Sequence, residues 1–199
     1  MPFALHGPTL TLRPPEPADA PALLDLASDP RVTQWFSWGP YASIDEPLAY
    51  IERCARQRAR AEHLDLLIVH RERGPAGITG LSEVSLRDAR CMVGTWFGRA
   101  FWGSGANREA KALIAHLAFE LLGMRRLGAY SNPANERSTR ALLAVGFTQE
   151  GLLREWHRHG AQWNDVRVFG LLRAEWAAGD LARVPVEVDG APPPGFAAG

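Results

Sequence analysis

The sequence predicts a mixed α/β (α+β) fold in which helices surround a mostly antiparallel sheet. Three observations lead to this class. Apolar segments between residues 64 and 97 are separated by short turns, which is typical of an antiparallel meander. A glycine loop at residues 103–107 runs directly into a strongly periodic helix. Two further segments, 147–156 and 163–172, flank a polar turn and are typical of a β-hairpin.

The composition is that of an ordinary globular protein. The 199 residues are 46% hydrophobic and 22% charged, with a formal net charge of zero. Without a basic excess, nucleic acid is not expected as a partner. No apolar run approaches membrane-spanning length and no signal peptide opens the chain, so we expect no membrane partner. Two distant cysteines without metal-ligand spacing indicate a reduced, cytoplasmic protein without a metal site.

The first third of the chain predicts a strand followed by two helices. Residues 9–13 alternate between polar and apolar side chains, which predicts the strand. Residues 18–27 place small and apolar side chains on one face and are followed by Asp29-Pro30, which ends the helix. Residues 45–61 open with Asp-Glu-Pro and become basic toward their end, an order of charges that suits the dipole of a second helix.

The loop at residues 31–43 carries four large aromatic side chains beside Gly39-Pro40. Loops rarely hold so many such groups unless they cover something. The aromatic rings either pack on the core or form one wall of a substrate pocket. In the second case Trp35 and Trp38 contact the substrate.

The glycine loop has the composition of an anion-binding turn. Gly103 and Gly105 allow a ligand to approach the backbone, and the first N–H groups of the next helix lack intrahelical partners. A phosphate suits that positive helix end. Alternatively, the glycines only relieve strain in a strand-to-helix turn that Ser104 caps. The loop lacks the Gly-Lys-Ser/Thr of a P-loop, and Arg108 replaces the third glycine of a dinucleotide fingerprint.

The rest of the chain predicts a strand at residues 127–130, a helix at 135–145 and the closing hairpin. Beyond the hairpin, residues 179–199 are rich in proline, glycine and alanine. We therefore expect one domain at residues 1–178 and a loosely ordered tail at 179–199. One segment of the tail can dock as an added strand, and its apolar residues are Val184, Val186 and Val188.

Taken together, the element order and three segments resemble the GNAT acetyltransferases, in particular the branch with the ribosomal-protein N-terminal acetyltransferases (RimJ/RimL-like). The resemblance covers about residues 8–176. Its three segments are residues 93–97 running into 101–107, residues 109–111 with 118–120, and residues 135–138 leading to 146–147 and 150–151. The family's loop usually ends in Gly or Ala, where this chain has Asn107.

The resemblance implies a sheet that splays in its middle, with helices on both faces. It also implies acetyl-CoA as the acyl donor and direct transfer to an amine without a covalent intermediate. The pantetheine arm would pair like a strand with backbone groups near Trp96, Phe97 and Gly98. The resemblance assigns the pyrophosphate to the loop residues Gly103, Ser104, Gly105, Ala106 and Asn107. Asn135 matches a position that binds pantetheine, although it also suits a helix cap.

Three residues are candidates for the catalytic roles. Many family members protonate the leaving thiolate with a Tyr, where this chain has Leu142, and Ser138 is the substitute in the N-terminal acetyltransferase branch. Ser138 also suits a simple hydrogen bond within the first helical turn. Glu83 is our candidate general base, with an exposed ion pair to a neighbouring arginine as the alternative. Asp165 is a second candidate base.

Trp156 on the hairpin completes the expected acceptor site, or it only packs the hairpin. His157 and His159 share a strand face without further ligands, so no metal is expected there. The sequence thus predicts an acetyl-CoA-dependent N-acetyltransferase that acts on a small-molecule amine or a protein N-terminus. A non-catalytic acyl-CoA-binding module that acts through a protein partner is the alternative. A homodimer is compatible with the resemblance.

Overall fold

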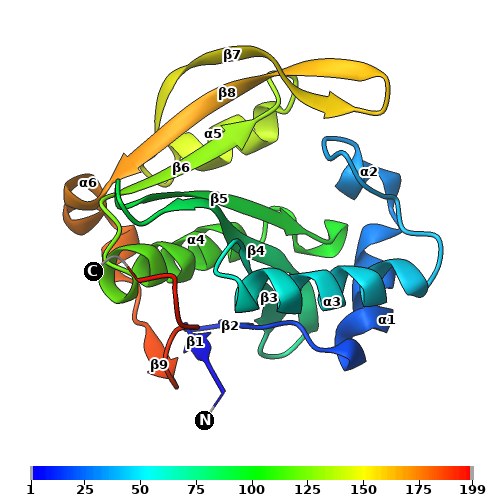
Figure 1. The fold of residues 1–199 in the computed structure, drawn as a ribbon, viewed down its shortest axis with the longest axis horizontal. Coiled ribbons are helices and arrows are strands. Elements are labelled where there is room, and N and C mark those ends of the chain that lie inside the picture. The colour runs from blue at the N-terminus through cyan, green and yellow to red at the C-terminus, as the bar shows by residue number, and fades with distance from the viewer. Residues whose placement is uncertain (1, 198–199) are drawn as a thin grey trace.

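The computed structural model describes residues 2–197 and contains one nine-stranded sheet (Figure 1). The strand order is β7-β8-β6-β5-β4-β3-β2-β1-β9, and every neighbouring pair is antiparallel except β5 and β6. The strands are β1 (Ala4–His6), β2 (Leu10–Arg13), β3 (Leu64–His70), β4 (Gly74–Ser85), β5 (Arg90–Phe97), β6 (Arg126–Ser131), β7 (Thr148–His159), β8 (Gln162–Leu172) and β9 (Glu187–Asp189). The predicted meander and hairpin are confirmed.

Helices cover both faces of the sheet, as predicted (Figure 1). The helices are α1 (Ala20–Ala27), α2 (Pro30–Thr33), α3 (Asp45–Ala59), α4 (Ala106–His116), α5 (Glu136–Leu143) and α6 (Arg173–Ala178). Alternation along β3 divides the core, because Leu66 and Ile68 pack with α4 whereas Leu67 packs with α1 and α3. The short helix α2 was not predicted, and it begins the aromatic loop where the side chain of Asp29 caps it.

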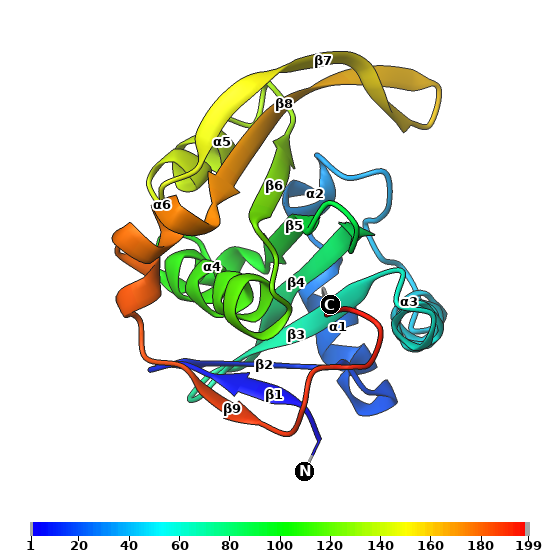
Figure 2. The ribbon, with the colours of Figure 1, turned by 60° about the vertical axis from the view of Figure 1, so that its left-hand side comes forward.

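The sheet splays between β5 and β6, which confirms the expected opening. These two strands pair only over Arg90–Met92 and Arg126–Gly128. β5 continues to Phe97 and β6 to Ser131 without further pairing, and Figure 2 shows the two strands diverging from their shared end. Backbone groups of β5 beyond Met92 are therefore left without a neighbouring strand on this side.

The C-terminal segment is better ordered than the sequence suggested. β9 pairs antiparallel with β1, with Val188 opposite Leu5, whereas Val184 and Val186 pack against the core. Phe196 is 0% exposed and belongs to the core around α4. The expectation of a loosely ordered tail is therefore wrong for residues 181–196, because Leu181 and Phe196 are buried and β9 pairs with β1. The domain division at residue 178 stays a prediction.

Within residues 2–197, no helix combines the length and the apolar character needed to cross a membrane.

Candidate active site

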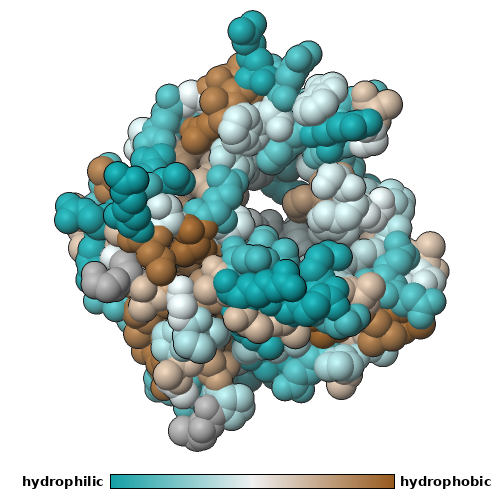
Figure 3. All heavy atoms as spheres, in the orientation of Figure 1, coloured by the Kyte–Doolittle hydropathy of each residue, from teal (hydrophilic) through white to brown (hydrophobic). Residues whose placement is uncertain are grey.

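A cavity of about 690 Å³ opens where β5 and β6 diverge. Its walls come from the aromatic loop, β5, the glycine loop, β6, α5 and the tip of β7. Figure 3 shows this side of the molecule hollowed between the β7–β8 hairpin and the α2 region. Side chains from both faces of β5 line the cavity, among them Trp96 and Thr95, so the cavity runs through the opening in the sheet.

The glycine loop presents backbone amides to this cavity. Gly103 (φ 74°) and Gly105 (φ 86°) adopt left-handed conformations that favour glycine, and no atom lies within 4 Å of either Cβ position. Gly103, Gly105 and Asn107 line the cavity. Their N–H groups have no hydrogen-bond partner among the described residues. The loop at the start of α4 is thus an anion site with its donors available.

The other two loop residues face away from the cavity. The Ser104 hydroxyl donates to the Phe101 carbonyl at 2.7 Å, and Ala106 is buried in the core. Their backbone N–H groups make only long contacts, from Ser104 to the Phe101 carbonyl and from Ala106 to the Ser104 hydroxyl, both at 3.4 Å. Ser104 therefore stiffens the turn through Phe101, whereas Gly105 is the N-cap of α4 and no side chain caps it, so the predicted Ser104 cap is not formed.

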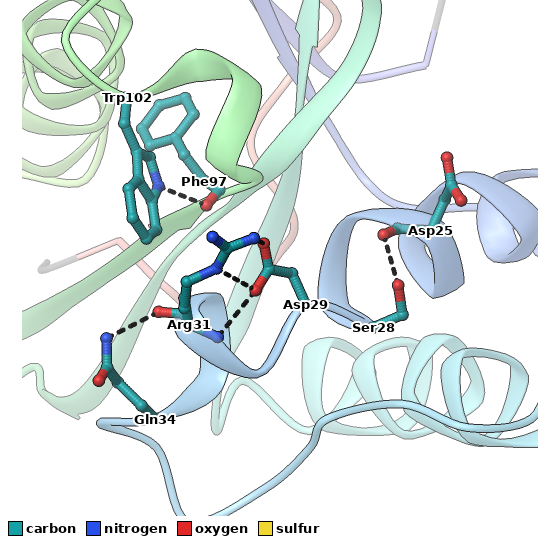
Figure 4. A network of polar contacts seen from close by, with 7 residues as sticks. All are labelled: Asp25, Ser28, Asp29, Arg31, Gln34, Phe97 and Trp102. Carbon is teal, nitrogen blue, oxygen red and sulfur yellow. Dashed lines mark hydrogen bonds and ion pairs between the residues drawn. The ribbon is translucent and has the colours of Figure 1, made fainter.

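Trp102 joins the loop to the end of β5. Its indole N–H donates to the Phe97 carbonyl at 2.9 Å (Figure 4). On its other side, the Arg137 guanidinium lies 3.3 Å from the centre of the Trp102 ring. Figure 4 also shows the Asp29–Arg31 pair that closes the first turn of α2. The loop thus has a fixed position relative to both β5 and α5.

The backbone groups of β5 that face the opening belong to other residues than the sequence predicted. Gly98 N–H donates to the Ala76 carbonyl, and the register pairs Gly77 with Phe97. Because alternate residues of an antiparallel strand point their backbone groups to opposite sides, Trp96 also faces β4. The prediction of free backbone groups at Trp96 and Gly98 is therefore wrong.

Val93, Thr95 and Phe97 are the residues whose backbone groups face the opening. The Phe97 carbonyl already accepts the Trp102 indole. Trp96 instead contributes its side chain, which lines the cavity, and buried Gly98 does not line it.

Asn135 and Ser138 both line the cavity from the start of α5. The Asn135 Oδ1 accepts the Ser138 N–H at 3.1 Å, so Asn135 caps the helix, as the alternative prediction had it. The cap uses only one lone pair of that oxygen and leaves the amide NH₂ group available. The Ser138 hydroxyl has no hydrogen-bond partner within residues 2–197, and buried Leu142 lies one turn further along the cavity wall.

Glu83 lies at the rim rather than in the cavity wall. It is exposed and has a left-handed backbone (φ 48°) in an irregular part of β4. The Tyr130 hydroxyl, which lines the cavity, donates to Glu83 Oε2 at 3.3 Å. Burial, followed by the nearby Glu83 carboxylate, raises the pKa of Tyr130. Among the described residues no arginine pairs with Glu83, so the expected alternative ion pair is not formed.

Asp165, the second candidate base, accepts the Glu155 N–H at 2.8 Å and lies outside the cavity wall.

Aromatic side chains form the opposite wall. Phe36 stacks on Trp38 with ring centres 5.2 Å apart, and Trp38 meets the edge of Trp96 at 5.6 Å. Trp35 and Trp156 line the same cavity, and Trp156 is 49% exposed. The structure therefore brings together the three tryptophans that the sequence assigned to the acceptor.

Several lining residues were not given a role from the sequence, and two of them are His157 and Lys111. The His157 ring lies 5.5 Å from the Tyr130 ring, and burial lowers the pKa of His157. The second is Lys111, a buried residue whose pKa burial lowers to about 7. In the sequence, Lys111 could have been noticed as the only lysine, placed within the apolar stretch that forms α4.

The cavity wall is basic. Lys111, Arg137 and Arg158 line it, and none of its described lining residues carries a carboxylate. Such a wall suits an anionic ligand. No group of three or more potential metal-ligating side chains occurs within residues 2–197.

A splayed sheet, an anion-binding loop at a helix N-terminus and an open strand edge are the parts of an acyltransferase that uses coenzyme A. The acetyltransferase (GNAT) domain model matches residues 9–148, and the chain belongs to this family of acetyltransferases. The uncharacterized N-acetyltransferase p20 of Bacillus licheniformis is 29% identical over 174 residues, which cover 87% of this chain and 98% of p20.

Two solved structures share the fold. A GCN5-related N-acetyltransferase from Brucella melitensis has a TM-score of 0.82 at 22% identity, over 90% of this chain and 82% of that protein. The spermidine N-acetyltransferase from Vibrio cholerae, solved with CoA and spermine, has a TM-score of 0.73 at 18% identity, over 84% of this chain and 98% of that protein.

Proposed function

We propose that this acetyltransferase moves the acetyl group of acetyl-CoA directly to a primary amine held in the same cavity. One observation carries the proposal: the unpartnered amides of Gly103, Gly105 and Asn107 and the open edge of β5 face one cavity. A diphosphate and a peptide-like arm are the two parts of coenzyme A that these features would bind.

In this proposal the pyrophosphate accepts hydrogen bonds from the loop amides, and Arg137 adds positive charge to the cavity wall. The pantetheine arm lies along the edge formed by Val93, Thr95 and Phe97. An N–H group of that edge, together with the NH₂ group of Asn135, would hold the thioester end of the donor. A backbone N–H beside the thioester oxygen would stabilise the oxyanion of a tetrahedral intermediate.

The amine nucleophile must lose a proton before it attacks. Glu83 would accept this proton through Tyr130 or a water, since the carboxylate lies at the rim. His157 is a competing base because it lines the cavity and its lowered pKa keeps the ring neutral at neutral pH. Ser138 is a poor acid by its own pKa. We propose that its hydroxyl donates a hydrogen bond to the leaving sulfur, or that it holds a water that does so.

Trp35, Trp38 and Trp156 would contact the acceptor, which we propose to be a protein N-terminus or a small amine with an apolar or aromatic group. The basic wall disfavours a polyamine, because several ammonium groups would enter without a carboxylate partner. A cytoplasmic location and a homodimer also stay proposals. The free thiols of Cys54 and Cys91 agree with a reducing compartment.

Release of CoA thiol from acetyl-CoA tests the function directly. We expect continued thiol release, beyond one equivalent per chain, to depend on an added amine, with aromatic α-amines ahead of spermidine. A protein that binds CoA in calorimetry but acetylates no amine in a broad panel, including peptide N-termini, would instead be the non-catalytic acyl-CoA-binding module.

A further inference from the structure

Lys111 is an amine inside the candidate donor site. It is the only lysine of the chain and lies one helical turn after Asn107 on α4. Its side chain lines the cavity although the residue is only 5% exposed. The amine donates a hydrogen bond to the Thr95 hydroxyl. Thr95 lies on the open edge of β5, so the amine is held at the place where the sheet splays.

The hydrogen bonds around Thr95 leave the lone pair of this amine unused. The Thr79 hydroxyl donates its one proton to the Gly94 carbonyl at 3.1 Å. Either oxygen could donate in the 2.8 Å contact between the Thr79 and Thr95 hydroxyls, and in the arrangement where Thr79 donates to Gly94 the donor is Thr95. Because Thr95 has then spent its proton, it can only accept from Lys111. A neutral Lys111 therefore keeps its lone pair available to the cavity.

Nothing nearby holds Lys111 in its charged form. No carboxylate among the described residues pairs with it, and none of the described residues lining the cavity is acidic. Burial of an unpaired ammonium is costly, and this burial lowers the pKa of Lys111 to about 7. Close to neutral pH a large fraction of the side chain is thus a free amine, the nucleophilic form.

From these contacts we propose that Lys111 is a self-acetylation site: it takes the acetyl group from acetyl-CoA bound in the same cavity. The inference rests on the proposed donor site. The open edge of β5 runs from Met92 to Phe97, and Thr95 lies within it. Roughly 10 Å of strand separate Thr95 from Met92, and roughly 7 Å separate it from Phe97. A thioester arm along this edge passes close to the amine.

The step balances without any further reactant. The Nζ lone pair attacks the thioester carbonyl carbon and forms the C–N bond. The C–S bond breaks, its electron pair leaves on sulfur, and a proton from the nitrogen ends on the thiolate. The products are an N-acetylated Lys111 and CoA thiol. The acetyl group would then occupy part of the donor cavity, so we expect the modified chain to bind CoA more weakly.

A single lysine makes the test simple. The full chain is incubated with excess acetyl-CoA, denatured and digested with a lysine-specific protease. An unmodified chain is cut once, after Lys111, whereas a chain acetylated at Lys111 stays whole, whatever happens at its N-terminus. Intact mass with and without acetyl-CoA gives the number of acetyl groups, and Lys111→Arg should gain none beyond any at the N-terminus.

Two controls separate a site-directed reaction from ordinary chemical acetylation. The double variant Gly103→Val/Gly105→Val, designed to lose the donor, should acquire the acetyl group at least about tenfold more slowly. p-Nitrophenyl acetate, an acetyl donor without phosphate or pantetheine, should modify both proteins at the same slow rate. Calorimetry with CoA is run on the same samples.

Each outcome decides the inference. Protection of the Lys111 bond that depends on acetyl-CoA and on the two glycines supports it. CoA binding with complete cleavage overturns the inference and leaves the proposed function standing. Equal modification of wild type and the glycine variant overturns it as well. If CoA does not bind at all, the proposed function fails and the inference fails with it.

Discussion

Lys111 illustrates how position changes the chemistry of a single side chain. The sequence marks it only as the sole lysine within an apolar helix stretch. Burial lowers the pKa of Lys111, and its amine donates to Thr95, which in turn contacts Thr79 on the neighbouring strand. No periodicity argument could have placed those hydroxyls, because they reach the lysine only through the strand register.

Lys111→Met should change how stability depends on pH. The folded pKa of about 7 lies below the ordinary value of 10.5. Between these values the unfolded chain binds more protons, so the wild-type free energy of unfolding rises with pH and the cost is fully present below pH 7. Relative to the variant, the free energy of unfolding of wild type should therefore rise by a few kcal/mol over this pH range, since each pKa unit corresponds to roughly 1.4 kcal/mol. Urea titrations from pH 6 to about 10.5 measure this; parallel curves for the two proteins contradict the account.

Glu83→Gln should lower kcat by about a hundredfold and reshape its pH profile, because a general base supplies a factor of this size. His157→Gln is measured in the same way, and a loss of kcat in this variant alone would make His157 the base. The matched control is Glu52→Gln, which removes an exposed carboxylate on α3 that pairs with Arg56. An unchanged pH profile in the Glu83 variant would remove Glu83 from the mechanism.

At the scale of elements, most of the secondary structure was predictable and the details of the strand edge were not. The meander, the glycine loop with α4 and the hairpin have strong local patterns. The three consecutive residues Trp96, Phe97 and Gly98 could not all face one edge, because backbone groups alternate along a strand. Only the register with β4 decides which of them do. β1 was missed because three residues are too short to show alternation.

Glu109 fixes α4 against β2 and so supports the loop at the start of that helix. Its carboxylate accepts hydrogen bonds from Thr9 N–H (2.7 Å), the Thr9 hydroxyl (2.6 Å) and Leu10 N–H (2.8 Å). Glu109→Ala should lower the free energy of unfolding by about 1–3 kcal/mol, because the N–H of buried Leu10 loses its partner. Glu52→Ala, which removes an exposed ion pair, should cost about 0–1 kcal/mol in the same urea titration. Equal losses for the two variants would refute this role.

For the whole molecule, the C-terminal segment is a structural part of the fold. A composition rich in proline and glycine predicted looseness, but it could not reveal that Phe196 fills a place in the core around α4. The pairing of β9 with β1 joins the two ends of the chain, and their separation in sequence hides it from any local pattern.

Phe196→Ala should therefore destabilise the protein by about 3–5 kcal/mol, the usual cost of removing a fully buried phenylalanine side chain. Leu86→Ala, at a side chain that is 42% exposed, is the control and should change the free energy of unfolding by less than about 0.5 kcal/mol. Chemical denaturation measures both. An effect of Phe196→Ala as small as that of the control would mean that the segment does not pack in solution.

The central claim is that loop amides before α4 grip the diphosphate of coenzyme A. Calorimetric titration of CoA into wild type, Gly103→Val/Gly105→Val and Gly74→Val tests it. Gly74 shares the left-handed backbone (φ 73°) and the open space at Cβ but is the first residue of β4, away from the cavity. We predict that the double loop variant loses at least about a hundredfold in affinity, equivalent to one or two hydrogen bonds to a charged group, while Gly74→Val binds like wild type. Undiminished binding by the loop variant, or no binding by wild type at millimolar CoA, would contradict the account.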